Sequence, residues 1–380
     1  MQIKYDYIFA GAGLSSLMIL DKMIDARLLE GKKVLLLELN DKNDNDRTWC
    51  FWDDKSSDFD DLVSKIWKQA LFVNEKQTIK CLSGEANYKM IESIHFYNYV
   101  LNKLKKYPEI IWKKEKFIAF EDQNLSVIVT SNVAKYTAKI FFNSVFDASK
   151  IENDKKYPLL KQHFIGWFVK SNNPIFDANC ATFMDFSIPQ NGNTRFMYVL
   201  PFSETEALVE YTLFSANLLS ENEYEQAISD YLKEKGALTF EITKKEQGNI
   251  PMTVFPFWKS NSRNVLHIGT AGGWTKASTG YTFKNTIKQS ERVILLLKKP
   301  MIDFRKFHKP NRFLFYDTLF VRVLYKNNAL GKKIFSNMFL KVHPKKIFRF
   351  LDEESNLKEE LEVILACPKI PFLKALLEIK

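Results

Sequence analysis

Glu210 is an acid whose neighbours in the sequence are almost all apolar. It lies in residues 207–215, ALVEYTLFS, which are typical of a buried strand. A carboxyl group among apolar side chains is desolvated, which raises its pKa and keeps its proton available for general acid catalysis. A salt-bridged or edge position in a strand explains the same pattern, so the residues alone leave both interpretations open.

Asp185 is a second acid in an apolar segment, TFMDF at 182–186. Buried acids usually have partners, so a structural ion pair and a role in catalysis are both open for it. The five histidines include no H-x-x-x-H pair, and the four cysteines include no C-x-x-C pair. We therefore expect no metal site, and widely spaced cysteines favour a reducing compartment.

Aromatic side chains gather in the segment NDRTWCFW at 45–52. Trp49, Phe51 and Trp52 can line a substrate pocket and stabilise a cation with their π faces. Tyr281, which comes just before a predicted helix, is a further candidate for the pocket. Packing in the protein core explains such aromatic residues equally well.

A phosphate-binding pattern stands at the start of the chain. Gly11 and Gly13 follow an apolar strand and open a helical segment, with Ser16 at the usual place of the third glycine in G-x-G-x-x-G. The first glycine permits the turn, the second lets the backbone approach a pyrophosphate, and the third mainly allows close packing. Glu38 ends the next apolar strand, where an acid can bond a ribose hydroxyl. The pattern predicts a dinucleotide-binding βαβ unit.

A second glycine-rich turn, GTAGG at 269–273, follows another apolar strand and precedes a helix from about residue 281. It suits a second approach to an extended cofactor, which favours FAD over NAD. Arg47 can pair with a flavin phosphate or with a carboxylate such as Asp185. The further residues predicted to bind the cofactor are Gly269, Gly272, Gly273, Thr279 and Gly280.

The elements that must position these residues form an α/β protein. The region 163–214 is rich in strands, with a hairpin signal at Asn191-Gly192, and it separates the two βα units. The predicted fold is a Rossmann-like FAD-binding domain with an inserted antiparallel β-sheet substrate domain and a helical C-terminal region. The predicted ranges are 1–70, 93–155 and 262–298 for the FAD-binding domain, 71–92 and 156–261 for the substrate domain, and 299–380 for a helical, basic, membrane-facing region.

Positive charge gathers late in the chain. The net charge is +10, and residues 298–349 contain fourteen Lys or Arg against two acids. Basic segments with large apolar residues suit an anionic membrane surface, although an ordinary helical cap explains them too. The sequence contains no nucleic-acid recognition module, no signal-peptide pattern and no apolar run of about 18 residues, so we expect peripheral or monotopic membrane contact rather than a spanning helix.

Several segments, taken in order, resemble the lycopene β-cyclase family of bacterial carotenoid pathways. The segments are NDRTWCFW at 45–52, FIGWFVK at 164–170, TFMDF at 182–186, RFMYVLPF at 195–202, ALVEYTLFS at 207–215, GNIPM at 248–252 and HIGTAGGWTKASTGYTF at 267–283. The resemblance runs from Gly11 to about Lys298. It departs from the family at Tyr211, where the motif has a second acid between Glu210 and Thr212.

This resemblance implies that the chain converts lycopene to β-carotene without net redox change, using reduced FAD supplied with electrons by NAD(P)H. It favours Glu210 as the proton donor and keeps Asp185 as a candidate. It implies lycopene and other carotenoids as ligands, a peripheral place on the cytoplasmic side of the membrane, and other carotenoid-pathway enzymes as partners. The dipole of the helix after Tyr281 would then stabilise an anionic reduced flavin.

Two other functions fit the same sequence. One is an FAD-dependent hydroxylase or reductase acting on an isoprenoid lipid, which would consume NAD(P)H in proportion to its product. The other is a non-catalytic carotenoid-binding scaffold on the membrane, to which loss of Glu210 would be harmless.

Overall fold

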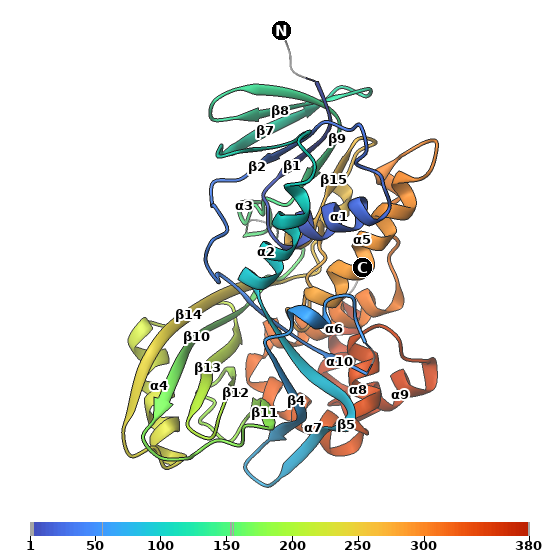
Figure 1. Cartoon of the computed structure of the whole chain (residues 1–380). Helices are drawn as coiled ribbons and strands as arrows, with labels where there is room; N and C mark the ends of the chain where they lie inside the picture. Colours follow the sequence, from blue (N-terminus) through green and yellow to red (C-terminus); the bar gives the residue numbers. More distant parts are fainter. Residues whose placement is uncertain (1–3, 55, 153, 155, 379–380) are drawn as a thin grey trace.

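The computed structural model describes residues 4–54, 56–152, 154 and 156–378. Two β-sheets form its framework, and a group of C-terminal helices packs beside the second sheet (Figure 1). The first sheet has the strand order β6-β2-β1-β9-β8-β7, with β15 also paired to β9, and the second has the order β14-β10-β13-β12-β11-β4-β5-β3.

The first sheet is the nucleotide-type sheet. Its strands are β1 (Lys4–Ala10), β2 (Val34–Leu37), β6 (Ile110–Lys113), β7 (Phe117–Asp122), β8 (Val127–Ser131), β9 (Lys135–Asn143) and β15 (Val265–His267). Strands β6, β2, β1, β9 and β15 run parallel, whereas β7, β8 and β9 form an antiparallel meander. The apolar run of β2 is buried at every position, as expected for a parallel strand covered on both faces.

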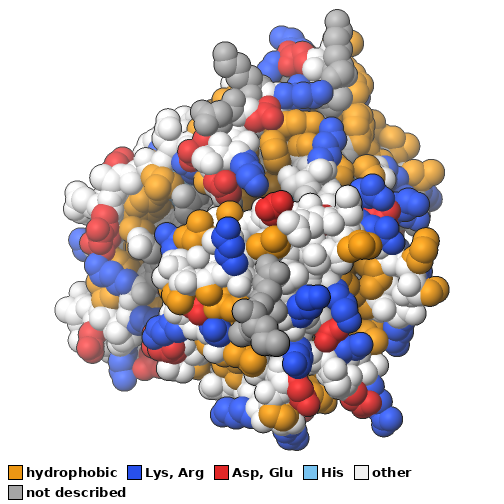
Figure 2. Space-filling model, turned by 90° about the horizontal axis from the view of Figure 1, so that it is seen from above, with side chains coloured by type: hydrophobic (Ala, Val, Ile, Leu, Met, Phe, Trp, Pro, Cys, Tyr) orange, Lys and Arg blue, Asp and Glu red, His pale blue; other side chains and the backbone are white. Residues whose placement is uncertain are grey.

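Helices α1 (Leu14–Asp25), α2 (Ser93–Leu104) and α5 (Phe283–Leu297) pack together with one face of this sheet. A short helix, α3 (Ser149–Glu152), follows β9. Because α1 comes directly after β1, and α5 follows the turn after β15, both helices begin near the same edge of the sheet. Viewed from the β7–β8 end, hydrophobic and basic side chains are interspersed over the surface (Figure 2).

The second sheet is mostly antiparallel. Its strands are β3 (Thr48–Asp53), β4 (Lys65–Val73), β5 (Thr78–Glu92), β10 (Leu160–Ser171), β11 (Cys180–Asp185), β12 (Thr194–Pro201), β13 (Glu206–Ser215) and β14 (Phe240–Met252). The pair β4–β11 is parallel. The hairpin signal is confirmed, because Asn191 and Gly192 have φ values of 45° and 80° in the turn before β12.

Both faces of the second sheet are covered. Helix α4 (Glu221–Glu234) packs on one face. The other face packs against C-terminal helices (Figure 1). These are α6 (Arg312–Lys326), α7 (Gly331–Lys341), α8 (Pro344–Leu351), α9 (Leu357–Ala366) and α10 (Lys369–Leu377). Strand β13 is therefore buried at nine of its ten positions, all but Glu206.

The structure confirms the predicted fold class, an α/β nucleotide domain with an inserted antiparallel sheet and C-terminal helices. The division of the chain into domains stays a prediction, but two segments of the range 1–70 pair in the second sheet. Strand β3 pairs with β5, and residue 70 lies inside β4, which pairs with β5 and β11. The polar segment around the aromatic cluster concealed this strand. Residues 1–3, 55, 153, 155 and 379–380 of the predicted ranges lie outside the described residues.

Candidate active site

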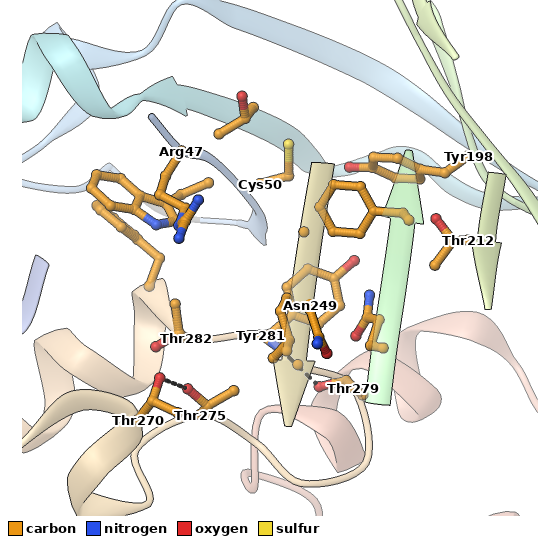
Figure 3. A pocket seen from close by; sticks show the side chains of 18 of the residues that line it. Arg47, Cys50, Tyr198, Thr212, Asn249, Thr270, Thr275, Thr279, Tyr281 and Thr282 are labelled. Atoms are coloured by element: carbon orange, nitrogen blue, oxygen red, sulfur yellow. Dashed lines mark hydrogen bonds between the residues drawn. The ribbon is translucent and has the colours of Figure 1, made fainter. Parts of the chain in front are cut away.

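A cavity of about 580 Å³ lies where the first sheet, the second sheet and the C-terminal helices meet. Its walls carry residues of α1 at one end and residues of β12, β13, α7 and α8 at the other. Thr270, Thr275 and Thr282 lie on one side of the close-up view and Tyr198 and Thr212 on the other, with Tyr281 between them (Figure 3). The cofactor-type loops and Glu210 therefore face one continuous space.

The N-terminal glycines shape the first end of the cavity. Gly11 has a φ of 85°, and a Cβ atom there would lie 2.3 Å from Ser144 Oγ, so this position requires glycine. Gly13 precedes α1 and lines the cavity, and a Cβ atom there would meet no atom within 4 Å. The backbone at Gly13 is thus open to a ligand at a helix N-terminus.

Of the other residues predicted to bind the cofactor at this end, Arg47 lines the cavity, whereas Glu38 and Ser16 support the turn and the helix beside it. Glu38 accepts a hydrogen bond from the Ala12 backbone N–H at 2.8 Å, so its carboxylate braces the glycine turn. Ser16 is fully buried within α1, in keeping with the packing role of a third glycine, and Ser15 lines the cavity instead. Arg47 lines the cavity and donates to the backbone carbonyl of Asp46.

In the second glycine-rich turn and the residues after it, some of the predicted residues line the cavity and others pack behind it. Gly269, with a φ of 59°, and Gly280, with a φ of 72°, both line the cavity. Thr279 lines it as well. A Cβ atom at Gly272 would lie 2.1 Å from the His267 carbonyl oxygen, so this glycine allows close packing behind the turn. Gly273, with a φ of 72°, ends the short 3-10 helix η3 (Gly269–Gly272).

The cavity has the features that an extended anionic cofactor requires. Helices α1 and α5 both begin at its wall, at Gly13 and Thr282, and helix N-termini attract negative charge. Lys42, which sequence reasoning missed, also lines the wall, where its Nζ lies 3.8 Å from Glu38 and 3.5 Å from Asp46. Thr286 Oγ1 and Gln162 Oε1 line the cavity and have no hydrogen-bond partner among the described residues. The residues present therefore fit a flavin dinucleotide.

Glu210 lies at the far end of the cavity, on β13. Its side chain is 7% exposed, and Thr212 Oγ1 donates to its Oε2 at 3.4 Å. Burial raises the pKa of Glu210 well above its ordinary value, and the negative charge of Glu246 raises this pKa further. Both effects favour the protonated carboxyl group, the form that proton donation requires.

Glu246, on β14, was missed in the sequence. It is half-buried, lines the same cavity, and accepts a hydrogen bond from Thr48 Oγ1 at 3.2 Å. Its local sequence, KKEQ, is typical of a solvated strand, and most of β14 before Gly248 is indeed exposed. Only the pairing of strands far apart in the sequence brings it beside Glu210, so no local signal identified it.

Asp185 lies on the side of the sheet that faces α4. Its Oδ1 accepts hydrogen bonds from the Ser187 backbone N–H and hydroxyl at 2.9 and 2.6 Å. Its Oδ2 accepts one from Tyr231 at 2.9 Å and pairs with Lys235 at 3.4 Å. Asp185 thus has the partners of a structural acid, and its catalytic role stays a prediction without support from this geometry.

Tyr211 also points toward α4. Its hydroxyl accepts a hydrogen bond from Arg195 at 2.9 Å, and its ring packs in the cluster of buried side chains that includes α4. Successive side chains of a strand alternate between faces, so Tyr211 faces away from the cavity that Glu210 and Thr212 line. The tyrosine that stands in place of the family's second acid therefore lies on the face of the sheet that α4 covers, and not in the cavity.

The four predicted pocket aromatics divide between the cavity and the core. Trp49 and Tyr281 line the cavity. Phe51 stacks on Phe283 with ring centroids 4.9 Å apart in the core of the nucleotide domain. Trp52 donates to Asp352 Oδ2 at 2.7 Å and borders a separate small hollow of about 20 Å³.

Hydroxyl groups join the aromatic residues near Glu210. Tyr88 lies 2.7 Å from Tyr198 and 3.0 Å from Tyr281, measured between hydroxyl oxygens. Tyr281 also stacks on Phe183, with their centroids 6.3 Å apart. This end of the cavity is therefore a mostly aromatic chamber with a buried acid in its wall.

The fold is the fold of known flavoproteins. Similar solved structures include a flavoprotein/dehydrogenase from Cytophaga hutchinsonii, with 11% identity, a TM-score of 0.62, and 98% of each chain covered. They also include a geranylgeranyl bacteriochlorophyll reductase-like protein from Thermoplasma acidophilum, with 13% identity, a TM-score of 0.59, and 100% of this chain and 97% of that chain covered. The halogenase PltM in complex with phloroglucinol and FAD has 10% identity and a TM-score of 0.59, with 97% of this chain and 87% of that chain covered.

The sequence specifies the family within this fold class. Residues 6–377 match the model of the lycopene cyclase protein family, and the chain belongs to that family. It is 23% identical over 307 residues to the lycopene beta-cyclase of Pantoea ananas, which covers 78% of this chain and 75% of the relative. It is 23% identical over 249 residues to the lycopene beta-cyclase of Paracoccus sp. (strain N81106 / MBIC 01143), with 62% and 63% covered. The resemblance read from the sequence motifs is confirmed.

Proposed function

We propose that this protein is an FAD-dependent lycopene cyclase that converts lycopene to β-carotene by acid-catalysed ring closure without net redox change. The observation that carries the proposal is the position of Glu210. It is a buried carboxyl group, with its pKa raised by burial, in an aromatic chamber that is continuous with a cavity of flavoprotein type. An isomerisation that begins with proton transfer to an alkene needs such an acid and needs water kept away from the resulting cation.

Each part of the chamber has a role in this chemistry. Glu210 donates its proton to the terminal double bond of the polyene, and the neighbouring double bond closes the ring to give a tertiary carbocation. Tyr198, Tyr281 and Phe183 line the chamber, exclude water and present π faces to the cation. Loss of a ring proton restores a double bond, so the product is an isomer of the substrate.

The cofactor end of the cavity is suited to reduced FAD. Gly13 and the N-terminus of α1 would hold the diphosphate, with Arg47 and Lys42 beside it. Thr270, Thr279 and the N-terminus of α5 would face the flavin side of the cofactor. Reduced flavin would supply negative charge that stabilises a nearby cation, and NAD(P)H is its proposed source of electrons.

We further propose that α9 and α10 rest on the cytoplasmic surface of an anionic membrane. The apolar side chains that suggested membrane contact in the sequence are largely inward: Val321, Leu324, Ile334, Phe339, Ile347 and Phe348 are buried. Exposed apolar side chains are instead found on the last two helices. They are Leu357, Leu361, Ile364, Leu365, Ile370, Leu373, Leu376 and Leu377. Among the residues that the structure describes, no helix has the length and apolar character needed to cross a bilayer.

This surface is close to the cavity. Helix α9 packs against α7 and α8, and those two helices supply Phe339 and Ile347 to the cavity wall. A carotenoid dissolved in the bilayer would then reach the chamber through the thickness of one helix layer. Other carotenoid-pathway enzymes on the same membrane are the proposed suppliers of the substrate.

The membrane contact predicts a specific loss of binding. Replacing Leu361, Leu365 and Leu373 by Ser should weaken binding to phosphatidylglycerol-containing vesicles by at least tenfold in a flotation assay, because each side chain loses apolar area buried in lipid. The matched control replaces Leu125, which is 84% exposed on the loop between β7 and β8, by Ser. Equal loss in both variants would contradict a docking role for α9 and α10.

Pigment analysis of a lycopene-accumulating host that expresses this chain tests the proposed function. We expect β-carotene, with a monocyclic product if only one end is closed. A Glu210→Gln variant that still binds flavin should leave lycopene unchanged. Unchanged lycopene with folded, flavin-loaded wild-type protein would overturn the proposal, and NAD(P)H consumption equal to product formed would favour a redox enzyme instead.

A further inference from the structure

Glu210 and Glu246 lie on either side of a glycine in the middle of the second sheet. In the strand register, Gly166 of β10 is opposite Glu210 of β13 on one side and opposite Glu246 of β14 on the other. Residues opposite one another on neighbouring strands direct their side chains to the same face. The two carboxyl groups are therefore separated by a position that has no side chain.

The side chains of both glutamates lie close to the Cα atom of this glycine. A Cβ atom at Gly166 would lie 2.8 Å from Glu210 Cγ and 3.3 Å from Glu246 Cγ. The backbone of Gly166 does not have a positive φ. The requirement for glycine at this position is thus a requirement for space, which the two glutamate side chains share with Leu208, whose Cδ1 would lie 2.9 Å from the same Cβ atom.

We propose that Glu246 is a positioning residue that shares the proton of Glu210 across Gly166, so that the two carboxyl groups act as one acid pair during ring closure. The pair holds one proton before the reaction, and the negative charge of Glu246 keeps that proton on Glu210. Two carboxyl groups in direct contact are expected to titrate together in this way. The proposal rests on the proposed cyclase function.

The proton balance of the reaction closes within this pair. The O–H bond of Glu210 breaks as a C–H bond forms at the terminal double bond, and the pair then carries two negative charges opposite one carbocation. A ring C–H bond next breaks, its electrons form the ring double bond, and the proton returns to the pair at Glu210. No oxidant or reductant takes part in these steps.

Glu246 also connects the pair to the cavity wall and to water. It is half-buried whereas Glu210 is buried, and Thr48 Oγ1 donates to it. It can therefore exchange the shared proton with solvent between turnovers, which a fully buried acid does slowly. The hydroxyl of Thr48 donates to Oε2 of Glu246 and so restrains this carboxylate.

The other titratable groups that act on Glu210 stay neutral. They are Cys50 of β3, Tyr198 of β12 and Tyr281 before α5. Burial raises the pKa of each above its ordinary value, so none of them gains charge between pH 5 and 9. Glu246 is then the group whose charge sets the titration of Glu210.

The pH dependence of cyclisation by the flavin-loaded protein in lycopene-containing vesicles tests this pair. In Glu246→Gln the negative charge is lost, so Glu210 should lose its proton at lower pH and the alkaline limb of the activity profile should shift to lower pH. At pH values above both limbs, activity relative to wild type should be lower by about tenfold for each pH unit of the shift. Glu246→Asp, which keeps the charge, should restore the wild-type limb. A uniform loss in Glu246→Gln with an unmoved limb would show a structural role and overturn the proposal.

An infrared pH titration separates this proposal from the proposed function. The protonated-carboxyl band of Glu210 is identified by its loss in Glu210→Gln, and it can be followed in flavin-loaded protein without any substrate. We expect the band to disappear at lower pH in Glu246→Gln than in wild type. An unchanged titration would overturn the shared proton even if lycopene is cyclised, whereas a shifted titration in a protein that leaves lycopene unchanged would overturn only the cyclase function.

Discussion

The two faces of the second sheet each hold a buried acid, and the two acids have opposite surroundings. On the α4 face, Asp185 accepts hydrogen bonds from Tyr231 and Ser187 and pairs with Lys235. On the cavity face, Glu210 has a threonine hydroxyl and a second carboxyl group, Glu246, beside it. The cation and donors around Asp185 compensate a buried carboxylate and hold the fold together, whereas the second acid beside Glu210 raises the pKa of Glu210 and favours the protonated form that can donate.

The largest effect that this comparison predicts is the loss of activity in Glu210→Gln. Glutamine has nearly the same shape but no acidic proton, so cyclisation should fall by about 10²- to 10⁴-fold, the usual contribution of general acid catalysis. Flavin binding, measured by absorbance of the purified protein, should be unchanged. A variant that keeps more than a tenth of wild-type activity would remove Glu210 from its role.

The matched change on the other face, Asp185→Asn, should reduce stability rather than catalysis. It removes the charge that pairs with Lys235 and weakens the hydrogen bonds from Ser187, which should lower the free energy of unfolding by about 1–3 kcal/mol. Chemical denaturation measures this loss. Activity per folded, flavin-loaded molecule should stay within about twofold of wild type, and a much larger fall would give Asp185 a catalytic role after all.

The stability of Glu210→Gln should differ from wild type in a pH-dependent way. Because the folded protein raises the pKa of Glu210 above its ordinary value of 4.5, wild type keeps the associated stability below about pH 4.5 and loses it as pH rises through the folded value. Glutamine does not titrate. The melting temperature of Glu210→Gln relative to wild type should therefore rise from pH 4 to pH 8, and a constant difference would contradict the raised pKa.

Tyr211→Phe should have the smallest effect of the four. It removes the hydrogen bond from Arg195 on the α4 face, at a cost of about 0.5–1.5 kcal/mol in the free energy of unfolding. Because the ring faces away from the cavity, cyclisation should be unchanged. Thermal melts and activity assays on the same preparation would test both statements, and a lower turnover with normal stability would place this side chain in the reaction.

Sequence patterns predicted one partner of the acid pair and missed the other. The apolar neighbours of Glu210 in the sequence predicted that it lies in a buried strand. Glu246 instead lies in a polar segment of a mostly exposed strand. Its place beside Glu210 depends on the register of β10 with both β13 and β14, and on Gly166 between them. Register between strands that are distant in the chain has no local signature.

The same limit applies to the aromatic cluster and the C-terminal helices. The run around Trp49 and Trp52 indicated a pocket, but alternation along β3 places Trp49 and Phe51 on the face of the nucleotide-domain core and Trp52 on the opposite face, and of these three Trp49 lines the cavity. Large apolar residues mixed with Lys and Arg suited both a membrane face and a core-facing helix, and in α6–α8 the structure buries or half-buries all of them but Phe315, Tyr325 and Leu340. The βαβ unit and the second glycine turn were predicted well because their spacing is local.

Cyclisation in D₂O tests the central claim, proton donation by Glu210 without net redox change, most directly. Lycopene in vesicles is incubated anaerobically with flavin-loaded protein and NADPH, and the product is analysed by mass spectrometry. We predict one deuterium for each ring formed, and NADPH consumption well below the number of rings. A ring product that carries no deuterium, or that takes hydrogen from labelled NADPH, would contradict the account.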